Sequence, residues 1–382
     1  MGDQFAGAAV VGIGRTAYTR KSGRTTLAMT VEAVRNAVAD AGLKLSDVDG
    51  IINFNTGDSA SSMRVAHAIG NDDCGWTVDI MGGGNVVCGV VATAAAAIIT
   101  GQCDVAVVFR TLGSGTRYGK INGTIEVPGD LQFAAPHGHL VPPQWFAMGA
   151  RRHQHIYGSK AEDLGAIAVQ QRAHALNNPH AVAKSAMSID DYMESRMVFD
   201  PFRVPDCCYE VDGSVALVLT SAKRAKDLPH KPVTIVGQGD SFGFGGNVDE
   251  FDDLTCMYSR DAAKRLWKNT GLKAQDMDVA LMYDCFTYTV MATFEDFGFC
   301  GKGEVGDFFR AGKATYGGDV VVNPHGGLLS EGYIHGLNHH YEAVLQLRGE
   351  AGNRQVENAE LALVTAGAGP FGTSLVYSGA SA

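Results

Sequence analysis

The chain has 382 residues, of which 46% are hydrophobic and 19% charged, so it has enough apolar side chains to fill one large core or two moderate ones. Its formal net charge is −10, and the absence of any cluster of lysines and arginines argues against a nucleic-acid partner. The first eight residues lack the basic and apolar segments of a signal peptide, and the longest apolar stretch, residues 86–99, is too short to cross a bilayer. We therefore expect a cytoplasmic protein without a membrane span.

Eight cysteines are scattered along the chain without regular spacing and without a Cys-x-x-Cys motif. In a chain of this length the pattern predicts reduced, mostly buried thiols rather than a disulfide framework. Structural zinc sites use closely spaced pairs of cysteines or histidines, and no such set stands out. We expect no bound metal.

A pattern near the N-terminus recurs in the second half of the chain. Residues 30–52 read as an amphipathic helix, a Gly-Leu-Lys turn, an acidic turn and a strand, and residues 261–282 repeat this order. Gly42 matches Gly271, and an aspartate before each strand matches at the same offset. Equal spacing inside both copies predicts a duplicated α/β half.

A turn of three glycines, residues 82–84, leads into a helix over residues 85–99 that carries no charged side chain. A helix that is apolar on all sides belongs in the centre of a protein, between two layers, and we expect such a helix in each half. Short apolar runs predict buried strands, at residues 103–109, 215–220, 233–238 and 361–365. The elements indicate two doubly wound α/β halves.

The stretch between the halves differs in composition. Residues 112–200 contain several prolines, Trp145 and a polar helix over residues 161–176, which is typical of an inserted loop domain rather than of a core. We therefore expect three parts, with residues 1–111 plus 201–230 as the N-terminal half, 112–200 as the loop domain and 231–382 as the C-terminal half.

Several motifs resemble those of the thiolase superfamily. Residues 322–332, Val-Asn-Pro-His-Gly-Gly-Leu-Leu-Ser-Glu-Gly, resemble the stretch that leads to its catalytic Gly-His-Pro. Residues 284–287, Asp-Cys-Phe-Thr, resemble the His-Asp-Cys-Phe box of its sterol-carrier-type branch. Further matches follow in the same order, at residues 177–179, 198–200, 207–208, 212–213 and 347–352. The resemblance covers essentially the whole chain and implies the five-layer αβαβα thiolase fold, with the inserted loop domain.

The catalytic residues of a thiolase are nevertheless missing. The nucleophilic cysteine of that family stands at the N-terminus of the first central helix, and this position falls on Gly84. The histidines of the two motifs are replaced by Tyr333 and Tyr283, and the C-terminal Cys-Gly is Ala366-Gly367. The chain should not act as a thiolase.

Two tyrosines in place of two histidines, without the nucleophile, resemble the lipid-transfer-protein-like aldolases of steroid side-chain degradation. This resemblance implies retro-aldol cleavage of a β-hydroxyacyl-CoA, with a steroid or similar acyl chain, to a ketone or aldehyde plus acetyl-CoA or propanoyl-CoA. It also implies a CoA thioester as substrate without a separate cofactor, a homodimer, and a DUF35-type OB-fold partner in a heterotetramer.

The resemblance assigns Tyr283 and Tyr333 as an acid/base pair, and either tyrosine can take either role. An unperturbed tyrosine is a poor base at neutral pH, so a neighbour must assist, and His335 is the nearest candidate in the sequence. The backbone N–H groups of Gly84 and Gly367 correspond to oxyanion-hole positions of thiolases, so we expect them to stabilise the enolate.

Two other hypotheses remain open from the residues. A degenerate acyltransferase would use Cys88, about one helical turn beyond Gly84, as its nucleophile. A non-catalytic subunit would bind an acyl-CoA or sterol and stabilise a partner. His335, His339 and His340 lie at metal-ligand spacing, but no carboxylate or cysteine nearby in the sequence completes a set.

Overall fold

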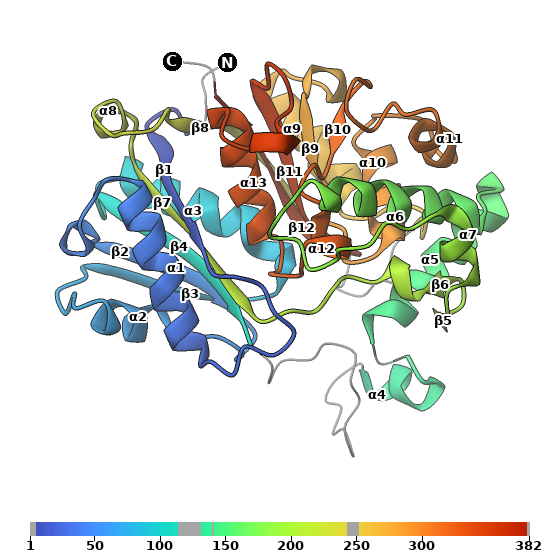
Figure 1. Cartoon of the computed structure of the whole chain (residues 1–382), viewed down its shortest axis with the longest axis horizontal. Coiled ribbons are helices and arrows are strands. Elements are labelled where there is room, and N and C mark those ends of the chain that lie inside the picture. The colour runs from blue at the N-terminus through green and yellow to red at the C-terminus, as the bar shows by residue number, and fades with distance from the viewer. Residues whose placement is uncertain (1–4, 114–130, 140, 243–251, 380–382) are drawn as a thin grey trace.

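The ten strands of the main sheet form two five-stranded halves in the computed structural model, which describes residues 5–113, 131–139, 141–242 and 252–379 (Figure 1). The strands of the first half are β1 (Ala8–Arg15), β2 (Gly50–Asn55), β3 (Trp76–Met81), β4 (Val105–Leu112) and β7 (Gly213–Ser221). Those of the second half are β8 (Val233–Phe242), β9 (Val279–Leu281), β10 (Val321–Val322), β11 (Leu361–Ala368) and β12 (Phe371–Ser378). A short antiparallel contact between β1 and β8 joins them.

The two halves have the same topology. The first runs β3-β2-β4-β7-β1 and the second β10-β9-β11-β12-β8. In each half the second strand pairs in parallel with both of its neighbours, and the remaining pairs are antiparallel. The duplication predicted from the repeated glycine turn is confirmed.

Helices complete five layers. The outer layer of the first half has α1 (Thr26–Asp40) and α2 (Ser62–Ala68), the centre has α3 (Val87–Ile99) and α13 (Leu337–Arg348), and the outer layer of the second half has α9 (Ser259–Thr270) and α10 (Thr287–Asp296) (Figure 1). The outer helices press onto glycines of the strands. A Cβ at Gly14 would lie 2.2 Å from the carbonyl oxygen of Ala33 on α1, and one at Gly239 would lie 2.4 Å from that of Ala262 on α9.

The two central helices differ in character. Helix α3 is apolar and buried, as the sequence predicts. Helix α13 is equally buried but carries polar side chains, so the expectation of an apolar central helix in the second half is wrong. Its polar groups are satisfied inside the protein, since Glu342 accepts hydrogen bonds from Arg354 and Gln346, and His340 bonds to Tyr377. A buried polar helix is stable when its groups are paired in this way.

The inserted segment contains α4 (Leu131–Ala134), α5 (Pro142–Tyr157), α6 (Ala161–Leu176), α7 (Ile189–Glu194) and the hairpin of β5 (Met197–Phe199) and β6 (Phe202–Arg203). The remaining short helices are α8 (Ala222–Ala225), α11 (Val305–Arg310) and α12 (Gly327–Ser330). The predicted polar helix is α6, which packs on α10, α11 and α12 and thus covers the second half (Figure 1). In the part of the chain that the structure describes, no helix has the length and apolar character needed to span a membrane.

Four buried histidines should make the stability of the fold decrease at acidic pH. Burial lowers the pKa of His340 to about 3, and burial also lowers the pKa values of His174, His325 and His335. The unfolded chain binds protons near pH 6.5 whereas these folded sites do not, so the free energy of unfolding should fall as the pH drops from about 7 through this range. We expect the melting temperature to decrease by about 10 °C between pH 7 and 5.

Thermal melts at constant ionic strength check this expectation. A His340→Gln variant should show a shallower pH dependence, because the variant has one buried imidazole fewer to protonate. His67 is the matched control, since its side chain is 81% exposed and His67→Gln should leave the slope unchanged. Equal slopes for wild type and His340→Gln would contradict the explanation.

Candidate active site

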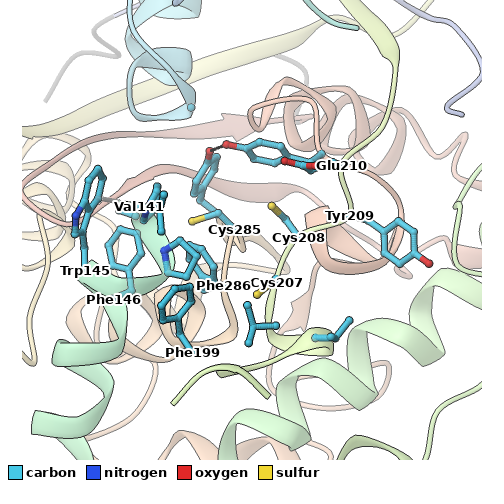
Figure 2. Close-up of a pocket in the computed structure, with 18 of the residues that line it drawn as sticks. Val141, Trp145, Phe146, Phe199, Cys207, Cys208, Tyr209, Glu210, Cys285 and Phe286 are labelled. Carbon is cyan, nitrogen blue, oxygen red and sulfur yellow. Dashed lines mark hydrogen bonds between the residues drawn. The ribbon is translucent and has the colours of Figure 1, made fainter. Parts of the chain in front are cut away.

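A pocket of about 760 Å³ opens where the inserted segment meets the second half. Figure 2 shows aromatic side chains, among them Trp145, Phe146 and Phe286, on one side of the pocket, with Cys208 and Glu210 on the other. Exposed cationic side chains also line it, and these are Arg20, Lys21 and Arg196. The pocket therefore combines an apolar interior with positive charge at its solvent-exposed margin.

Two tyrosine hydroxyls meet in the wall of this pocket. The Oη atoms of Tyr283 and Tyr333 are 3.0 Å apart, and the two residues are 4% and 8% exposed. Tyr283 follows β9, and its N–H donates to Oγ1 of Thr365 on β11. The N–H of Tyr333 donates to the carbonyl of Tyr209. Both backbones are fixed, so the hydroxyls are held at hydrogen-bonding distance of each other.

Tyr333 is neutral in this environment. Burial raises the pKa of Tyr333 well above its usual value of 10, and the neighbouring Tyr283 and Cys208 add to the rise. A tyrosinate is therefore disfavoured. The pair can still move a proton, because a hydroxyl that receives a proton on one lone pair can release its own proton to the other hydroxyl.

Gly84 makes room for Tyr283. A Cβ built at Gly84 would lie 2.0 Å from Oη of Tyr283 and 2.4 Å from its Cζ. The tyrosine hydroxyl therefore fills the space that any side chain at position 84 would occupy. This is the position at which the thiolase resemblance places the missing cysteine, so a nucleophile there and the tyrosine pair exclude each other.

The structure brings four predicted residues together. Gly84, Tyr283, Tyr333 and Gly367 all line the same pocket. Gly84 begins the short turn before α3, and Gly367 lies near the end of β11 with φ +122°, a conformation that suits glycine. The two tyrosines and the two glycines named from the sequence therefore lie in one pocket.

His335 lies next to Tyr333. Its ring packs edge-on against the ring of Tyr333, with centroids 4.9 Å apart, and its Nδ1 accepts hydrogen bonds from Arg110. Arg110 in turn forms an ion pair with Asp58. Asp58 and Arg110 were not predicted from the sequence, although Arg110 is the lone charged residue of the otherwise uncharged β4 and could have been singled out.

Cys88 is buried in α3, and the described residues that line the pocket do not include it. Its Sγ lies 3.5 Å from Nε2 of His340 and 3.6 Å from the carbonyl oxygen of Val364. Burial raises the pKa of the thiol well above 9, and Asp240 adds to the rise, so the thiolate needed for attack is disfavoured.

We expect a Cys88→Ala variant to retain wild-type turnover and to lose about 1 kcal/mol of stability, from the small cavity it creates. Intact-mass analysis after incubation with an acyl-CoA should show no adduct on the wild-type protein. An acyl group that labels wild type and not Cys88→Ala would instead support the acyltransferase hypothesis.

The remaining histidines of the sequence analysis have structural partners. His339 lies 3.2 Å from Oδ1 of Asp284 through Nε2 and 3.1 Å from Nε2 of His325 through Nδ1. Asp284 also accepts the backbone N–H groups of Leu328 and Leu329, which explains its presence in the motif. Among the described residues, no group of three or more His, Cys, Asp or Glu side chains is arranged to hold a metal ion.

The chain is similar to several known proteins. A family model described as thiolase C-terminal domain-like matches residues 245–377. The 17-hydroxy-3-oxo-4-pregnene-20-carboxyl-CoA lyase of Mycobacterium tuberculosis is 41% identical, over 95% of this chain and 96% of the lyase. The steroid side-chain-cleaving aldolase of Thermomonospora curvata is 38% identical, over 95% of each chain. A solved structure, the Ltp2-ChsH2(DUF35) aldolase, has a TM-score of 0.90 to this chain, at 37% identity and over 98% of each chain.

Proposed function

Because the chain belongs to the thiolase superfamily, in the family of the steroid side-chain-cleaving aldolases, we propose that it catalyses retro-aldol cleavage of a β-hydroxyacyl-CoA. The single observation that carries the proposal is the tyrosine pair, with its hydroxyls 3.0 Å apart in the space of a missing nucleophile. The chain is then a carbon–carbon lyase on a thiolase fold.

The reaction balances without a covalent intermediate. A base takes the proton of the β-hydroxyl, the Cα–Cβ bond breaks, and its electron pair forms the thioester enolate while the β-carbon becomes a ketone or aldehyde. A proton delivered to Cα then completes acetyl-CoA or propanoyl-CoA. Since no electrons are gained or lost overall, the reaction needs no redox cofactor.

The tyrosine pair can supply both proton steps. One hydroxyl accepts the proton of the β-hydroxyl while it donates its own proton to the second hydroxyl, and the second hydroxyl protonates Cα. Because burial raises the pKa of Tyr333, the proton must leave the pair as another enters, which avoids a free tyrosinate. Gly84 and Gly367 line the same pocket, and we infer that backbone N–H groups at these positions stabilise the enolate oxygen.

The pocket supports a bulky, rigid acyl chain. Its aromatic lining provides apolar contact area for a fused-ring system, and its volume of about 760 Å³ lies within the range that holds a drug-sized molecule. The exposed cations at its margin suit the phosphates of CoA. A steroid side-chain CoA thioester, the kind of molecule for which the Mycobacterium tuberculosis lyase is named, meets these requirements.

We also propose a homodimer that binds a DUF35-type OB-fold partner, as a heterotetramer in the cytoplasm. The similar solved structure is of an aldolase together with a DUF35 protein. Strand β3 pairs with β2 on one side, and exposed side chains alternate along it, so its outer edge is available to a second copy. Light scattering of the chain alone and with the co-expressed partner tests both assemblies.

The test of the function is a product assay with a steroid-tailed β-hydroxyacyl-CoA, in the absence and presence of a co-expressed DUF35-type partner. We expect the ketone or aldehyde and the short acyl-CoA to appear together. Substrate that binds but stays intact with the partner present would overturn the proposal and support a non-catalytic binding subunit.

A further inference from the structure

A buried ion pair, Asp58–Arg110, contacts His335, and His335 packs on Tyr333 of the tyrosine pair. Arg110, on β4, is fully buried, and its Nη1 and Nη2 donate to the two carboxylate oxygens of Asp58 at 2.8 and 2.6 Å. Burial of an ion pair costs desolvation energy that mutual attraction often fails to repay, so it is weak evidence for a role in stability. A role in the neighbouring site is the better explanation to test.

Arg110 fixes the tautomer of His335. Its Nε and Nη2 lie 3.0 and 2.8 Å from Nδ1 of His335, and a guanidinium has no lone pair to accept a proton from the ring. Nδ1 must therefore be the acceptor, which leaves the ring proton on Nε2 and the imidazole neutral.

The charged and titratable groups that face the ring agree with a neutral imidazole. Burial lowers the pKa of His335 well below 6.5, and Arg110 lowers it further, while Asp58 opposes the shift. The neutral ring of Tyr333 packs roughly perpendicular to the imidazole of His335, and Phe54 stacks on that imidazole with centroids 6.2 Å apart. Protonation of the imidazole would place a hydrogen on Nδ1 facing the N–H groups of Arg110, so the hydrogen bonds from Arg110 to Nδ1 would break.

His335 lies between two parts of the active site. Its Cε1 and Nε2 come within 3.7 and 3.9 Å of the Cβ position of Gly83, next to the Gly84 that contacts the hydroxyl of Tyr283. The planes of its imidazole ring and of the Tyr333 ring lie at 82° to each other. The residue adopts φ +51°, a left-handed conformation that costs a histidine about 1 kcal/mol, so the surroundings hold it in place.

We propose that Asp58, Arg110 and His335 form a positioning group that holds Tyr333 at a fixed distance from the Gly83–Gly84 turn, and that the group works with a neutral imidazole. The three residues act through Tyr333 and do not touch the substrate. The inference rests on the proposed function for its activity readout and on the geometry alone for its spectroscopic readout.

The test removes the charge pair without leaving a single buried charge. In the double variant Asp58→Asn/Arg110→Gln we expect kcat to fall about 10- to 100-fold at pH 8, with KM changed less, because Tyr333 loses its fixed position. With the arginine gone, the pKa of His335 should rise, although burial still holds it below 6.5, so kcat/KM should acquire a new acid limb at a higher pH than in the wild type. Adding His335→Asn, which tolerates the left-handed backbone, should remove the new limb.

A matched control separates this effect from general destabilisation. Glu342, on α13, and Arg354 form another buried ion pair, with Nε and Oε1 2.9 Å apart. Glu342→Gln/Arg354→Gln should lower stability and create no acid limb. An acid limb in this control, or a folded Asp58→Asn/Arg110→Gln protein with the wild-type pH profile, would overturn the proposal.

Nitrogen-15 NMR of histidine-labelled protein gives a readout that does not need turnover. The signals that disappear in His335→Asn identify this ring. In the wild type they should show a neutral, Nε2-protonated ring from pH 5.5 to 8, and in the double variant they should begin to titrate at a higher pH than in the wild type. A wild-type ring that titrates in this range, or that carries its proton on Nδ1, would overturn the proposal. A wild type with the expected ring but without carbon–carbon cleavage would contradict the proposed function alone.

Discussion

Replacing Gly84 by alanine is expected to lower kcat about 100-fold or more while the protein remains folded. The added Cβ would lie 2.0 Å from Oη of Tyr283, a distance that no real contact allows, so the tyrosine or the turn must move. Either movement separates the Tyr283 hydroxyl from Tyr333. Steady-state kinetics of product release, together with a thermal melt, measure the two effects.

Gly89, on helix α3 just after the Gly84 turn, provides the matched control. A Cβ at Gly89 would meet Cγ2 of Thr373 at 3.4 Å, which is ordinary contact, so Gly89→Ala should keep wild-type turnover. Gly84→Cys should behave like Gly84→Ala and should gain no acyl adduct, because the tyrosines leave no space for a productive thiolate. Wild-type turnover by Gly84→Ala would contradict the assignment of Tyr283.

Tyr283→Phe and Tyr333→Phe should each lower kcat about 1,000-fold, within the range typical of general acid–base catalysis. Each change removes one hydroxyl of a relay that needs both, so the double variant should be about as slow as either single variant. Tyr209 lines the same pocket, and Tyr209→Phe is the control that should retain kcat within about threefold. Additive losses in the double variant would mean that the two hydroxyls act independently.

The sequence predicts the fold well where the chain repeats itself. The matched turns at Gly42 and Gly271 correctly indicate two halves, and the uncharged run of residues 85–99 correctly indicates the central helix α3. The apolar character expected for the second central helix is wrong. Periodicity measures hydrophobicity alone, and it cannot reveal that Glu342 and His340 find partners in Arg354 and Tyr377.

The candidate site is predictable where it coincides with a motif. Tyr283 and Tyr333 stand at motif positions, and the structure places their hydroxyls together. The contact between Tyr283 and Gly84 joins residues about 200 positions apart, and it depends on a close approach that no local pattern encodes. Asp58 and Arg110 lie outside the motifs. Their contact with His335 results from the packing of the first half of the chain on the second half.

The central claim is that the tyrosine pair cleaves a carbon–carbon bond without an acyl-enzyme. A single-turnover experiment tests this most directly, with the chain and its partner in excess over a steroid-tailed β-hydroxyacyl-CoA and with products and intact protein followed by mass spectrometry. We predict equal amounts of ketone or aldehyde and short acyl-CoA, with the protein mass unchanged at every time point. An acyl adduct on the protein that forms and decays during turnover would contradict the account.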